Sequence, residues 1–140
     1  MKKIQTIILC CMTAMLALTS CEKKTAPIIA NEQAIETSPG VVEVTASVSA
    51  YEIDECGICY GTTFDSNITK ENAQAIFDCS TDPQSFDGSE IKVTFTLNVN
   101  TTYYFSIYAS NEKGISYSQP FSIKTSYKSP DIDDNLFPGY

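Results

Sequence analysis

Cysteines are the residues of this 140-residue chain with the most readable chemistry, and six are present. Cys56 and Cys59 stand in the segment Cys-Gly-Ile-Cys, and Cys79 follows 20 residues later. A Cys-x-x-Cys pair can be a redox centre when a helix N-terminus lowers the pKa of its first thiol, or can supply two of four zinc ligands. The sequence has no histidine and no second Cys-x-x-Cys pair, so it supplies no complete zinc site.

The flanking residues indicate a strand at this segment, and that changes what the cysteines can do. Residues three apart on a strand point to opposite faces. Cys56, Ile58 and Tyr60 should then face the core, while Cys59 faces outward. We predict a disulfide between Cys59 and Cys79 in an oxidising compartment, with Cys56 as a buried free thiol. The alternative is that all three cysteines are free thiols.

Cys21 has a different setting, because it follows a typical secretion signal. Lys2 and Lys3 precede a mostly apolar stretch, Ile4 to Leu18, which is shorter than the roughly 20 residues of a membrane span. Leu18-Thr19-Ser20-Cys21 resembles the lipobox of bacterial lipoproteins. In that family the cysteine sulfur takes a diacylglyceryl group, a peptidase cuts before it, and the new amine is acylated, commonly with palmitate. The alternative is an ordinary signal peptide with an incidental cysteine.

The lipobox resemblance implies a protein of the cell envelope, held in the outer membrane by its N-terminal lipid. Residues 1–20 would be the signal peptide and residues 21–27 a lipidated tether. The mixed charges of Glu22, Lys23 and Lys24 leave the leaflet open. Cleavage would leave seven lysines against 17 acids, a net charge of −10. This acidic balance argues against nucleic acid as a partner.

The sequence after residue 27 has the pattern of short strands. Strands are therefore expected to position any functional side chain. Period-two alternation predicts strands over Val42–Val48, Ile91–Leu97 and Tyr103–Ser110. Further strands are expected over Ile28–Ile35, Ile53–Thr63 and Ile115–Lys124, the last with Pro120 at an edge or bulge. Ile68–Phe77 fits a helical turn or a short strand. About seven strands predict an all-β immunoglobulin-like sandwich over residues 28–127.

The stretch Leu97-Asn98-Val99-Asn100-Thr101-Thr102-Tyr103, with the alternating residues after it, resembles a fibronectin type III domain. The resemblance implies that Tyr103 is the tyrosine corner, whose ring enters the core and whose hydroxyl bonds to upstream backbone. Val99 stands where that family usually has proline. The likeness covers about residues 34–125.

The segments Cys56–Thr63 and Ser110–Tyr117 extend this likeness to fibronectin-like domains of envelope lipoproteins in some Gram-negative gut bacteria. Those domains often carry an arginine before Gly-x-Cys-Tyr and another in the tyrosine-rich strand. Cys56 and Ser106 stand at these positions, so any role of those arginines does not carry over.

Aromatic and acidic side chains are the candidates for binding. Tyr104, Tyr108 and Tyr117 are out of phase with the core residues and could line an exposed sheet face that stacks on sugars or anchors a protein. The alternative is cross-strand pairing, with Tyr104 covering Gly57. The acids have no EF-hand spacing and are interpreted as solvated loop residues; they cluster at Glu52, Asp54 and Glu55, at Asp82, Asp87 and Glu90, and at Asp131, Asp133 and Asp134.

These features together favour a lipid-anchored envelope module that acts in binding, adhesion or spacing, without catalysis or cofactor. Its expected partners are the membrane, through the lipid, and an envelope protein or a glycan. An accessory subunit of a glycan-uptake or pilus assembly is the first alternative, and a small carboxylate-dependent glycoside hydrolase the second. The segment 128–140 is expected to be a flexible tail that could add to a partner's sheet edge.

Overall fold

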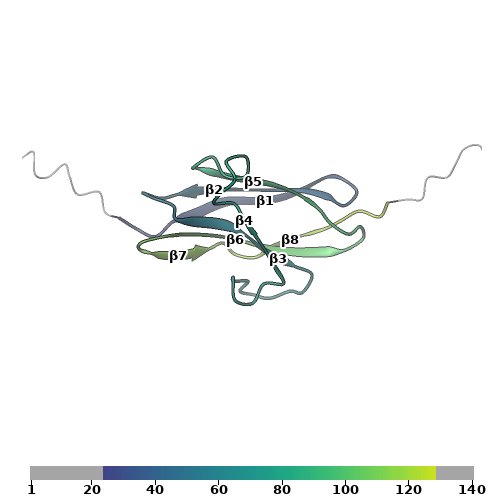
Figure 1. Ribbon diagram of the computed structural model, residues 1–140. Coiled ribbons are helices and arrows are strands. Elements are labelled where there is room, and N and C mark those ends of the chain that lie inside the picture. Colours follow the sequence, from purple (N-terminus) through teal and green to yellow (C-terminus); the bar gives the residue numbers. More distant parts are fainter. Residues whose placement is uncertain (1–23, 129–140) are drawn as a thin grey trace, which may run out of the picture.

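Two antiparallel sheets pack face to face in this computed structural model, which describes residues 24–128 (Figure 1). The first sheet has the order β1-β2-β5, from β1 (Ile28–Ser38), β2 (Val41–Ser49) and β5 (Glu90–Thr96). The second has the order β4-β3-β6-β7, with β8 also paired to β6; its strands are β4 (Ala75–Asp78), β3 (Glu55–Gly61), β6 (Thr102–Asn111), β7 (Gly114–Tyr117) and β8 (Phe121–Lys124). The predicted all-β sandwich is thereby confirmed.

Eight strands form where about seven were expected, because the last predicted strand is interrupted. β7 pairs Tyr117 with Tyr108, and β8 pairs Phe121 with Phe105, so one extra residue lies between the two halves. Pro120 stands in this gap and has no N–H to give to a ladder. Ser118 spans the gap instead: its N–H donates to the carbonyl of Ile107, and its hydroxyl accepts from the Ile107 N–H. Pro120 therefore lies at an interruption along the edge of the second sheet, in agreement with the predicted edge or bulge position.

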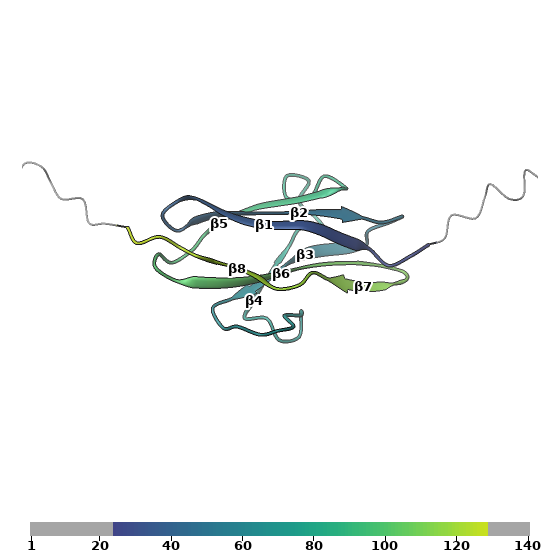
Figure 2. The same ribbon diagram turned by 180° about the vertical axis from the view of Figure 1, so that it is seen from behind.

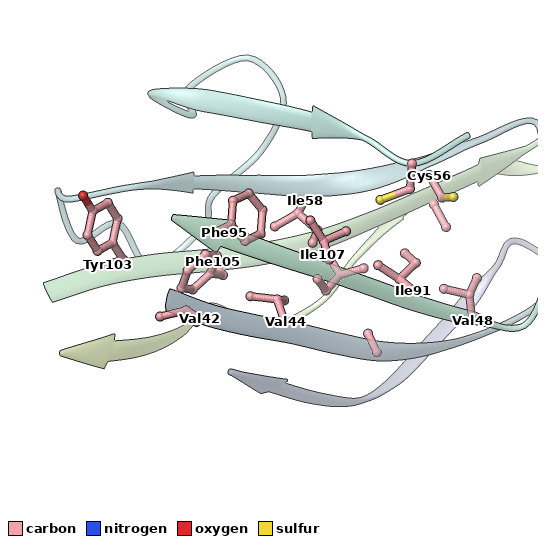
Figure 3. Close-up of a cluster of buried hydrophobic side chains, with 14 residues drawn as sticks. Val42, Val44, Val48, Cys56, Ile58, Ile91, Phe95, Tyr103, Phe105 and Ile107 are labelled. Atoms are coloured by element: carbon pink, nitrogen blue, oxygen red, sulfur yellow. The ribbon is translucent and has the colours of Figure 1, made fainter. Parts of the chain in front are cut away.

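The core lies between the sheets and follows the predicted alternation. On β2, Val42, Val44, Ala46 and Val48 are buried, and the residues between them are only partly covered. Figure 3 shows the valines of β2 with Ile91 and Phe95 of β5, facing side chains of the second sheet. Burial of one face of each strand against the other sheet is what fixes the register.

Tyr103 occupies the position expected of a tyrosine corner. Its side chain belongs to the core cluster and is 7% exposed. Its hydroxyl accepts a hydrogen bond of 3.1 Å from the N–H of Asn98, five residues upstream. The predicted bond to upstream backbone is thus present, and it ties the β5–β6 connection to β6.

The two ends of the described chain lie at opposite ends of the sandwich (Figures 1 and 2). At one end the carbonyl of Thr25 accepts a hydrogen bond from the side chain of Asn111, the last residue of β6. At the other the N–H and hydroxyl of Ser126 donate to the carboxylate of Glu36, near the end of β1. The predicted signal peptide, Cys21 and the tail beyond Lys128 lie outside the described residues.

Candidate functional site

The three predicted surface tyrosines share one face of the second sheet, but that face is partly covered. Tyr104 and Tyr108 on β6 and Tyr117 on β7 point away from the main core, as their phase predicted. Residues 62–74, which connect β3 to β4, cross this face and pack Ile68 against Tyr108. Tyr108 is completely buried, so its prediction as a surface residue is wrong. Alternation fixes the face of a side chain, but not whether a loop covers that face.

Lys70 holds the 62–74 loop against the sheet through three contacts. Its backbone N–H donates to the hydroxyl of Tyr117 at 3.3 Å, and its ammonium pairs with the carboxylate of Glu55. The ammonium also lies 4.9 Å from the centre of the Tyr108 ring, within cation–π range. The hydrogen bond that the Lys70 ammonium donates to the Glu55 carboxylate is the main reason that the pKa of Lys70 is raised. These contacts hold the 62–74 loop directly against Tyr108 and Tyr117.

Tyr108 covers Gly57, its cross-strand partner. A Cβ at Gly57 would lie 2.6 Å from the Tyr108 hydroxyl and 2.3 Å from the carbonyl oxygen of Phe77. The alternative prediction of cross-strand packing over Gly57 is right in kind, but Tyr108 makes the contact and Tyr104 stands opposite Gly61. Within the described residues the buried Tyr108 hydroxyl has no hydrogen-bond partner. Burial raises the pKa of this phenol.

An aromatic pair remains accessible at the edge of this face. Phe64, in the 62–74 loop, is 66% exposed and meets the half-buried ring of Tyr104 edge to face at 5.5 Å between centroids. We call this pair the Phe64–Tyr104 patch. Sequence reasoning missed Phe64, although a lone aromatic residue within the polar run Thr-Thr-Phe-Asp-Ser is the signal that could have found it. The patch offers ring surface to a ligand.

A small cavity lies beside Gly61 and the 62–74 loop. Its volume is about 70 Å³, and Asp65 and Asn72 are among its lining residues. That space fits water molecules, because a water occupies about 30 Å³ in the liquid. It is far below the roughly 300–1,000 Å³ of ligand pockets. Ligand contact in this region therefore depends on the rings of the Phe64–Tyr104 patch.

The three cysteines of the sandwich are free and buried. Cys56 and Cys79 belong to the main core, whereas Cys59 belongs to the second cluster with Ile68 and Tyr108. The structure therefore does not bring Cys59 and Cys79 together as the predicted disulfide requires; they lie on opposite faces of the sheet. Burial raises the pKa of Cys56 and Cys59 to about 11 and that of Cys79 to about 12. A nucleophilic redox cysteine needs the opposite shift.

The acidic residues of the described loops mostly organise their own turns. Asp82 accepts hydrogen bonds from the Ser85 hydroxyl and from backbone, and Asp87 accepts them from the N–H groups of Ser89 and Glu90. These bonds lower the pKa of both carboxyls. A glycosidase acid needs a raised carboxyl pKa. Residues 24–128 contain no group of three His, Cys, Asp or Glu side chains that could hold a metal ion.

Comparison of the chain with protein-family models and with curated proteins gives no match. Among residues 24–128 no helix is long and apolar enough to cross a membrane.

Proposed function

We propose that this chain is a lipid-anchored envelope protein whose fibronectin type III-like module acts in spacing and binding. The observation that carries the proposal is the opposite placement of the two ends of the sandwich. Thr25 lies four residues after Cys21, the proposed lipid attachment site, and contacts one end of the module. Ser126 contacts the other end. A lipid at Cys21 would then hold one end of the module close to the membrane.

The length of β1 sets how far such a module reaches. β1 alone has 11 residues, and a strand rises about 3.3 Å per residue, so it spans roughly 35 Å. Ser126 is then displaced from the anchored end by about this length. A passive spacer needs no more than a rigid body of this shape, and two packed sheets supply it.

The fibronectin type III assignment is supported by two features. Tyr103 makes the tyrosine-corner hydrogen bond to upstream backbone. The fourth strand, β4, pairs with β3 and not with the β1-β2-β5 sheet. In immunoglobulin constant domains the fourth strand joins the sheet of the first two strands, so the strand order here departs from that type.

Intact-mass analysis of the protein expressed in a Gram-negative host tests the anchor. We expect cleavage before Cys21, a mass increase that corresponds to acyl chains, and recovery in the membrane fraction. Cys21→Ser should abolish the mass increase and the membrane association, whereas the matched change Cys11→Ser should retain both. Unmodified Cys21 in the wild-type protein, or a wild-type protein found in the cytosol, would refute the proposal.

Binding through the Phe64–Tyr104 patch is a second candidate function, favoured by the exposure of Phe64. Paired rings can stack on a sugar or anchor a protein partner, including a neighbour in a glycan-uptake or pilus assembly. A glycan array and a cross-linking pull-down from intact cells separate these partners. Loss of the hits in Phe64→Ala, but not in the control Tyr51→Ala, would support the patch. Hits that survive Phe64→Ala would exclude it.

A further inference from the structure

Cys56 and Cys79 stand opposite each other at the end of the β3–β4 ladder. Gly57 pairs with Asp78, and one step further the N–H of Cys79 donates to the carbonyl of Cys56 at 2.9 Å. Directly opposed residues of antiparallel strands have Cα atoms about 4.5–5.5 Å apart. Disulfides join Cα atoms that are about 4.4–6.8 Å apart. The backbone therefore already has the separation that a disulfide needs.

Both side chains also point into the same space. Opposed residues of paired strands project to one face, and both cysteines are completely buried in the main core cluster. Figure 3 shows Cys56 within this cluster, to which Cys79 also belongs. Cys59 lies in the cluster on the opposite face of β3 and competes with neither.

We propose that Cys56 and Cys79 form a disulfide when the chain folds in the presence of a thiol–disulfide oxidant. The two thiols lose their protons, a sulfur–sulfur bond forms, and two electrons reduce the disulfide of the oxidant to two thiols. The inference does not depend on the proposed function, because the oxidant can be supplied in vitro.

The bond should form during folding and not afterwards. Thiol–disulfide exchange with the oxidant needs one of the cysteines as a thiolate. Burial in the folded protein raises the pKa of both thiols to about 11–12, so thiolates are scarce there and an oxidant has no access to them. In the unfolded chain the thiols are accessible and have ordinary pKa values. The pairing of β3 with β4 would then bring the two sulfurs together before the core closes.

The bridge would fasten a weakly held part of the sandwich. β4 has four residues, stands at the edge of its sheet and pairs with β3 alone. The loop that the disulfide closes contains β4 and the 62–74 loop that carries Phe64. Cross-linking this loop restricts the unfolded chain, so the oxidised protein should melt roughly 10 °C or more above the reduced one.

Peptide mapping after refolding tests the pairing. The full chain is reduced, denatured and refolded in a mixture of reduced and oxidised glutathione, then digested with trypsin without reduction. Cleavage after Lys24, Lys70 and Lys92 gives peptide 25–70, which contains Cys56 and Cys59, and peptide 71–92, which contains Cys79. We expect these peptides to be linked in the wild type and in Cys59→Ser, and separate in Cys56→Ser. Separate peptides in the wild type, or a link lost in Cys59→Ser and kept in Cys56→Ser, would overturn the proposal.

Melting temperatures provide a second readout that does not depend on variants that fold poorly. Wild-type protein refolded with the oxidant should melt above wild-type protein refolded in a reductant, and Cys59→Ser should show the same difference. Equal melting temperatures of the two wild-type preparations would show that no bond closes this loop.

Discussion

Removing one hydroxyl oxygen should have opposite effects at two tyrosines of β6. Tyr103→Phe deletes the acceptor of the Asn98 N–H at 3.1 Å. Tyr108→Phe deletes a buried hydroxyl that has no partner within the described residues. The two substitutions are chemically identical and lie on the same strand, so each serves as the matched control of the other.

The expected magnitudes follow from hydrogen bonding and desolvation. A net hydrogen bond contributes about 1 kcal/mol to the free energy of unfolding, which Tyr103→Phe should lose. An unsatisfied buried polar group costs about 1–3 kcal/mol. Tyr108→Phe removes that cost but leaves a small void over Gly57, so we expect a net gain of about 1 kcal/mol. The two variants should thus differ by about 2 kcal/mol.

Urea unfolding at neutral pH measures both variants against the wild type. With a denaturant slope of about 1–1.5 kcal/mol per molar for a domain of this size, the two midpoints should lie more than 1 M apart. Denaturant slopes equal to that of the wild type would confirm that the substitutions change neither the folded nor the unfolded state. A Tyr108→Phe variant less stable than the wild type would refute the reasoning, because the hydroxyl would then have a favourable partner.

Three other perturbations test separate parts of the sandwich. Gly57→Ala should lower the free energy of unfolding by about 1–3 kcal/mol, because its Cβ meets the Phe77 carbonyl. Gly61→Ala should cost less, since the three atoms nearest to its Cβ belong to a glutamine side chain and not to backbone. Hydrogen bonds, first of all from a serine hydroxyl, lower the pKa of Glu36, so its stabilising effect should be lost as pH falls from about 5 toward 3. Urea midpoints of Glu36→Gln should then depend less on pH over this range, and an unchanged pH profile would contradict the assignment. Ile68→Ala should lower the free energy of local opening of the 62–74 loop by about 2 kcal/mol, and so raise the labelling rate of Cys59 by a thiol reagent roughly 30-fold. A labelling rate equal to that of the wild type would show that the loop is not held by this contact.

Local patterns in the sequence were enough to predict the strands. Alternation at β2 and β5 follows directly from burial of one face, so Val44 and Val93 could be assigned to the core without coordinates. Pro120 marked a gap in the last strand because it cannot donate to a ladder. The tyrosine corner at Tyr103 was predicted from the resemblance to fibronectin type III domains, and its hydrogen bond is local because Asn98 lies only five residues upstream.

The candidate site was harder to predict because it depends on contacts between distant segments. The phase of Tyr108 correctly gave its face, but the loop that buries it is held by Lys70, and no local pattern fixes the path of that loop. Phe64 gains its partner Tyr104 by the same docking. Periodicity alone therefore could not predict whether this face is exposed to solvent.

The sequence by itself determined that Cys56 and Cys59 lie on opposite faces of a strand, because residues three apart on a strand must alternate. Only the tertiary structure decided which of them stands opposite Cys79, since that depends on the register between β3 and β4. A shift of the pairing by one residue would turn every side chain of β4 to the other face. Register is set by packing of the whole strand against the core, so a cysteine pairing across strands is a property of the fold and not of the spacing.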